Sequence, residues 1–78
     1  MNPRVRSLSL GADYTLLLTF TSGEKRVFDM KPYLGTGVFQ ALRDPAAFSD
    51  VKVFLGSIAW AGGQDLCPDT FFEESTPV

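Results

Sequence analysis

The chain has 78 residues, of which 45% are hydrophobic and 21% charged, a composition typical of one folded domain rather than of a disordered segment or a multidomain enzyme. A formal net charge of −2 and a pI near 4.8 disfavour a domain that holds nucleic-acid phosphates through its overall field. No apolar run approaches the ~20 residues that span a bilayer, so no membrane segment is expected.

Cysteine content and the N-terminus indicate the compartment. Cys67 is the only cysteine, so no intramolecular disulfide can form. The first residues lack the apolar stretch of a secretory signal. We therefore expect a cytoplasmic protein made of a single domain over residues 1–78.

The first half of the chain predicts three strands. Residues 5–10 read as a short strand that ends at a Gly11-Ala12-Asp13 turn. Residues 14–20 alternate apolar and polar faces with a period of two, and residues 24–30 resume extended sequence after Thr21-Ser22-Gly23. These two runs predict a hairpin whose glycine takes a positive φ.

The second half predicts a helical crossover followed by a second hairpin. Residues 35–43 have apolar residues at helical spacing, and Asp44-Pro45 is typical of a cap and first turn. Residues 51–55 and 58–60 alternate again around Gly56-Ser57, which we expect to be the two-residue turn. Pro68 is expected to start a short helix, and residues 75–77 to fray into solvent.

Together these elements predict an α+β fold. It consists of a small, mostly antiparallel sheet of about five strands in two hairpins, with a short helical crossover packed on one face.

The sequence contains no catalytic constellation. It has no histidine, so neither a Ser-His-Asp nor a Cys-His arrangement can form, and we expect no catalytic residue, no cofactor and no metal ligand. The carboxylates of Asp65 and Asp69, four residues apart, leave a metal-dependent enzyme open as an alternative. Their ordinary roles are to form a turn and to begin a helix. Cys67 reads as a small buried hydrophobe.

The end of the chain offers the best candidate for a contact surface. Aromatic residues make up 13% of the chain, and adjacent rings such as Phe71-Phe72 cannot both point inward. Exposed aromatic groups beside acids are typical of protein interfaces. The candidate partner-binding residues are Trp60, Asp65, Asp69, Phe71 and Phe72.

Several segments distributed along the chain resemble those of a known family. The segments concerned are Tyr14 to Phe20, Ser22-Gly23, Phe28-Asp29-Met30, Pro32-Tyr33-Leu34, Phe39, Leu42, Phe48, Ile58-Ala59-Trp60 and Asp65 to Asp69. The chain resembles the bacterial domain-of-unknown-function family 2442 from Val5 to about Glu74, most specifically in Trp-x-Gly-Gly-x-Asp-Leu-x-Pro-Asp. It departs at Ala61, where the family often has Pro, and at Phe72, where it often has Tyr.

The resemblance implies binding rather than chemistry. Members are similar to the N-terminal domain of proteins that continue into a helix-turn-helix, and some are encoded beside another small protein, as in toxin and antitoxin pairs. We therefore expect an interaction module, the antitoxin-like or regulatory member of a two-gene pair, bound to another small protein or to itself. A DNA-associated regulator that acts through a separate helix-turn-helix protein is a further alternative.

Overall fold

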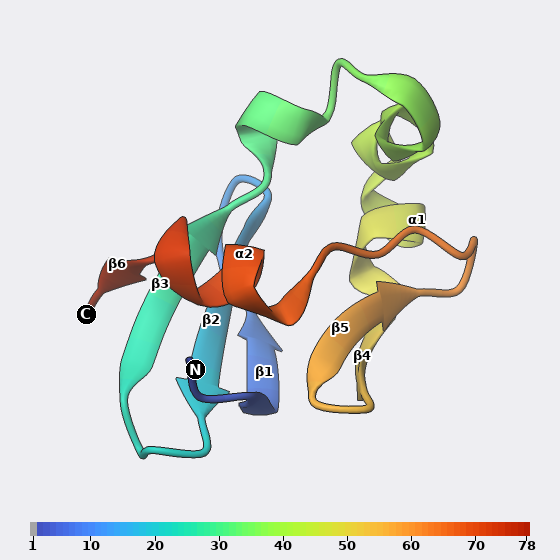
Figure 1. The fold of residues 1–78 in the computed structure, drawn as a ribbon. Helices are drawn as coiled ribbons and strands as arrows, with labels where there is room; N and C mark the ends of the chain where they lie inside the picture. The colour runs from blue at the N-terminus through green and yellow to red at the C-terminus, as the bar shows by residue number, and fades with distance from the viewer. Residues whose placement is uncertain (1) are drawn as a thin grey trace.

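The computed structural model describes residues 2–78, which fold into two antiparallel sheets connected by short helical segments (Figure 1). The first sheet has the order β1-β2-β3-β6, with β1 at Val5–Leu10, β2 at Thr15–Phe20, β3 at Lys25–Asp29 and β6 at Thr76–Pro77. The second sheet is one hairpin, β4 (Val51–Phe54) and β5 (Ser57–Trp60).

Short helical segments join the two sheets and close the chain. The 3₁₀ segments η1 (Lys31–Tyr33) and η2 (Gly37–Arg43) lead to α1 (Pro45–Ser49), and α2 (Pro68–Glu73) follows the second hairpin. The predicted α+β fold with two hairpins is thus confirmed, with the detail that the second hairpin forms its own sheet. The helical crossover is mostly 3₁₀ rather than α-helical.

The first hairpin follows the alternation of the sequence. In β2, Leu16, Leu18 and Phe20 face the core with no exposed surface, while the residues between them face outward. Gly23 closes the turn at a φ of +90°, as its position predicted. The outer face of this sheet is left without a covering layer, which is common for antiparallel sheets.

The prediction that the C-terminus frays is wrong. Thr76 and Pro77 pair with β3, and Ser75 is buried. The guanidinium of Arg26 donates from Nε to the Ser75 hydroxyl at 2.8 Å and from Nη2 to the Ser75 carbonyl at 2.7 Å. These charge-assisted bonds hold the last residues against the sheet.

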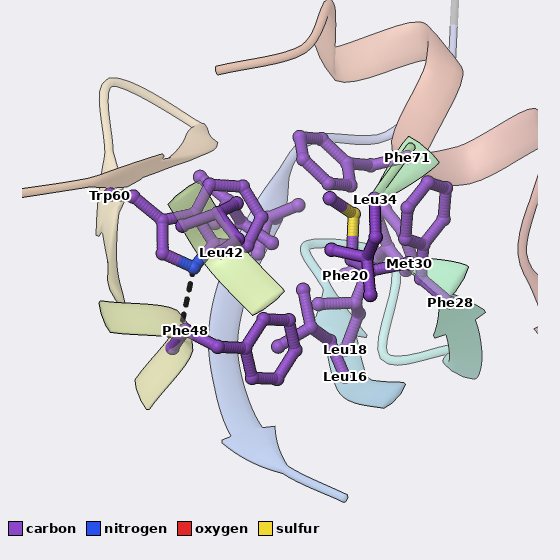
Figure 2. Close-up of a cluster of buried hydrophobic side chains, with 12 residues drawn as sticks. Leu16, Leu18, Phe20, Phe28, Met30, Leu34, Leu42, Phe48, Trp60 and Phe71 are labelled. Carbon is purple, nitrogen blue, oxygen red and sulfur yellow. Dashed lines mark hydrogen bonds between the residues drawn. The ribbon is translucent and has the colours of Figure 1, made fainter. Parts of the chain in front are cut away.

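One hydrophobic core lies between the inner face of the first sheet and the segments that cover this face, which are the helical crossover, the second hairpin and α2 (Figure 2). The ring of Phe71 from α2 packs on that of Phe28 with centroids 4.9 Å apart. The indole Nε1 of Trp60 donates to the carbonyl of Phe48 at 2.8 Å, the dashed line in Figure 2, and so joins β5 to α1. Asp44 caps α1 by accepting from the Ala46 N–H at 3.2 Å.

The two adjacent phenylalanines of α2 provide a test of this arrangement. Phe71 has no exposed surface, so Phe71→Ala is expected to destabilise the protein by about 3–5 kcal/mol. Phe72 is half-buried, with an edge contact to Phe20 and the Arg26 guanidinium over its ring, so Phe72→Ala should cost about 1–2 kcal/mol. Urea unfolding of both variants measures the difference; equal losses would contradict the assigned core.

Candidate functional site

The structure divides the five predicted contact residues between core and surface. Trp60 is 3% exposed and Phe71 0%, so neither side chain is available to a partner. The reason is strand and helix geometry: Trp60 pairs with Val51 on the inner face of the second hairpin, and Phe71 lies over Phe28. These two residues are therefore core residues rather than contact residues.

The other three predicted residues reach the surface. Asp65 and Asp69 are exposed, and Phe72 is partly exposed. Asp65 lies opposite Ala59 in an isolated antiparallel bridge, because the chain reverses after β5 and returns along it. The Ser57 hydroxyl donates to the Leu66 carbonyl at 3.1 Å and holds this returning segment beside β5.

The reversal is built around Gln64. Its backbone carbonyl accepts from the Trp60 N–H at 3.1 Å, and its buried side chain donates from Nε2 to the Val38 carbonyl at 3.1 Å. A side chain at Gly62 would place its Cβ 2.7 Å from Oε1 of Gln64, and Gly63 has a φ of +91°. The positive φ of Gly63 favours glycine at that position, and a side chain at Gly62 would displace the buried Gln64 amide, so both glycines suit the turn that delivers Asp65 to β5.

The outer face of the second hairpin and the returning segment form a shallow hollow of about 280 Å³, here called the hairpin groove. Its lining residues are Phe54, Leu55, Ser57, Ile58, Ala59, Asp65, Leu66, Cys67 and Pro68. The floor is low because small side chains, Ser57 and Ala59, occupy the outer face of β5. The groove is predominantly apolar and carries one carboxylate.

Leu55 at the hairpin tip is the most unusual residue of the groove. It is 84% exposed and has a φ of +51°, and Gly56 follows at +77°. Both central residues of a two-residue hairpin turn of this type need a positive φ, which Asn, Asp and Gly tolerate and leucine does not. The tip therefore combines backbone strain with an exposed apolar side chain, and neither serves the core.

Sequence reasoning missed this tip because it placed the turn one residue late. The turn is Leu55-Gly56 rather than Gly56-Ser57, and Phe54 pairs with Ser57. Moving the turn by one residue shifts the pairing register by two and leaves the faces of β4 unchanged, so Phe54 lies on the outer face with Lys52, as the alternation predicted, and is 54% exposed. Glycine at the second turn position, as in Asn-Gly turns, was the available signal.

Cys67 also differs from its prediction as a buried hydrophobe. It is exposed, lines the hairpin groove and precedes α2, where its carbonyl accepts from the Thr70 N–H at 2.9 Å. Its side chain is therefore part of the groove surface.

The carboxylates of the site are not gathered into a metal centre. Within residues 2–78, no group of three or more His, Cys, Asp or Glu side chains is arranged to hold a metal ion.

A second hollow, of about 330 Å³, lies between the β1–β2 turn and α1 and includes Leu10, Tyr14 and Phe48 in its lining. At its rim, the Lys31 ammonium lies 3.3 Å from Asp13 Oδ2 and 3.1 Å from Asp29 Oδ1. Partial desolvation acts to raise the pKa of Asp29, but the Lys31 backbone N–H and ammonium outweigh it and lower that pKa.

Burial, followed by the negative charge of Glu74, raises the pKa of Tyr33, which lies away from the hairpin groove. Among residues 2–78, no helix is long and apolar enough to cross a membrane.

Fold and site define a small α+β domain with an open, apolar hairpin groove. The model of a family described as "Protein of unknown function (DUF2442)" matches residues 5–77, and the chain belongs to this family, as the sequence resemblance implied. No curated protein and no solved structure matches the chain.

The strain at Leu55 can be measured directly. Asparagine tolerates a positive φ, and little apolar contact is lost at an exposed tip, so Leu55→Asn should stabilise the protein by about 0.5–1 kcal/mol. Leu10→Asn is the matched control, since Leu10 is 47% exposed but has no positive φ, and it should bring no gain. Chemical denaturation compares both variants; a destabilised Leu55→Asn protein would contradict the assigned strain.

The ion pairs of Lys31 predict a pH dependence. The lowered pKa of Asp29 contributes stability that is present above its unfolded value and is lost as pH falls through the folded value. Lys31→Met removes the ammonium, so its stability deficit should be constant near neutral pH and shrink below about pH 4. Urea midpoints between pH 7 and pH 2.5 test this; a deficit that stays constant over that range would refute it.

Proposed function

We propose that the protein is a non-catalytic protein–protein interaction module of the bacterial cytoplasm, and that its contact surface is the hairpin groove. The observation that carries the proposal is Leu55, a leucine 84% exposed at a φ of +51°. Strained backbone persists where surrounding structure enforces it, and it is concentrated at functional sites. Exposed apolar groups gathered beside a hollow mark sites of contact with other proteins.

Neighbouring contacts support a rigid tip rather than a mobile one. The Val5 N–H donates to the Gly56 carbonyl at 3.0 Å, and a Cβ at Gly56 would lie 3.1 Å from Cβ of Arg4. The turn is therefore tied to β1. A pre-ordered contact surface loses less conformational entropy on binding, which favours recognition by a partner.

The acidic residues at the groove add charge to this surface. Asp65 lines the groove, and Asp69 follows one residue after the lining residue Pro68. Exposed charges at the rim of an apolar patch guide encounter and orient the partner. A partner encoded by a neighbouring gene would make this protein the antitoxin-like or regulatory member of a pair, as the family resemblance suggests.

Photo-crosslinking in the host cell tests the proposal. A benzophenone amino acid replaces Leu55, and a matched control replaces Val27, a 37% exposed residue on the outer face of β3. We expect one crosslinked product of defined mass from position 55 and none from position 27. Absence of a product at position 55, or equal products at both positions, would reject the hairpin groove as the contact surface.

A further inference from the structure

We infer that the protein that occupies the hairpin groove is a second copy of this chain, bound through a two-fold symmetric interface. This inference rests on the proposed function of the groove and names its partner. The inference is based on the order of side chains on the outer face of the second hairpin. When two copies of this face are related by a two-fold rotation, their charges and shapes match.

The charges come from one row of paired residues. Lys52 pairs with Ala59, and Ala59 pairs with Asp65, so the three side chains lie on the same face in the order Lys52, Ala59, Asp65. Two strand spacings separate the ammonium and carboxylate positions by roughly 10 Å. Both residues are exposed, and neither forms an ion pair within residues 2–78.

A two-fold axis parallel to β5 and above Ala59 brings these charges together. Rotation about such an axis exchanges the two sides of β5, so Lys52 of one copy faces Asp65 of the other, and the same pair forms again by symmetry. Other orientations of two such faces place like charges opposite each other, which disfavours them. The order Lys52, Ala59, Asp65 thus favours the dimer whose two-fold axis is parallel to β5.

The same rotation matches the apolar parts. Phe54 and Leu55 rise on one side of β5, and Leu66, Cys67 and Pro68 lie on the other, with Ser57 and Ala59 low between them. Each copy therefore presents the Phe54-Leu55 tip to the opposite wall of its partner's groove. An interface in which one patch meets the same patch is the usual form of a homodimer.

A charge-exchange experiment tests the inference on the full chain. In Lys52→Glu and in Asp65→Lys, the facing residues carry like charges in both symmetric contacts, so each variant should dimerise at least about tenfold more weakly. In an equimolar mixture, a heterodimer sets the introduced glutamate against the introduced lysine in one contact and the native Lys52 against the native Asp65 in the other. Heterodimers should therefore form with restored affinity. Lys25→Glu, on the outer face of the first sheet, is the charge-matched control and should leave dimerisation unchanged.

Sedimentation equilibrium of each variant and of the mixture gives the readout, with circular dichroism to show that each variant is folded. Dimerisation that is lost in both variants and regained in the mixture supports the inference. A monomeric wild-type protein, or single variants that dimerise normally, or a mixture that stays monomeric, overturns it. If the crosslink from position 55 then joins a different protein, the interaction module stands and only the identity of its partner is wrong.

Discussion

The structure depends on the burial of one sheet face by a chain that has few residues with which to cover it. Leu16, Leu18 and Phe20 of β2 have no exposed surface, and such burial is the main source of stability in a small domain. Three short pieces provide the cover: the crossover segments, α2 with Phe71, and the inner face of the second hairpin. Each piece is too short to fold alone, so all depend on this common core.

The open surface is a consequence of this covering role. A strand that turns Ile58 and Trp60 toward the core must turn the intervening residues away from it. Outward positions of a hairpin usually carry polar groups, but on this face Phe54 of β4 lies beside the strained, exposed Leu55. The tip is one of the exceptions to local rules in this fold, which also include Tyr14 at a φ of +62°, and such exceptions are expected at functional sites.

Local patterns predicted the fold better than the site. The first hairpin followed from the alternation in β2 and from Gly23, both of which are readable from neighbours in sequence. The groove depends on the turn register at Leu55-Gly56, for which Gly56 was the local signal, and on the bridge between Ala59 and Asp65, which local sequence does not contain. Trp60 and Phe71 were proposed as contacts because aromatic composition does not distinguish a core ring from an exposed one.

NMR spectra over a protein concentration series test whether two copies of the chain meet through the outer face of the second hairpin. We expect concentration-dependent shifts for the Leu55 and Leu66 methyl groups and the Ala59 amide, which belong to the groove. Signals from Leu17 and Val27, on the outer face of the first sheet, should stay fixed. Shifts confined to Leu17 and Val27, or none at any residue, would contradict a dimer formed through this face.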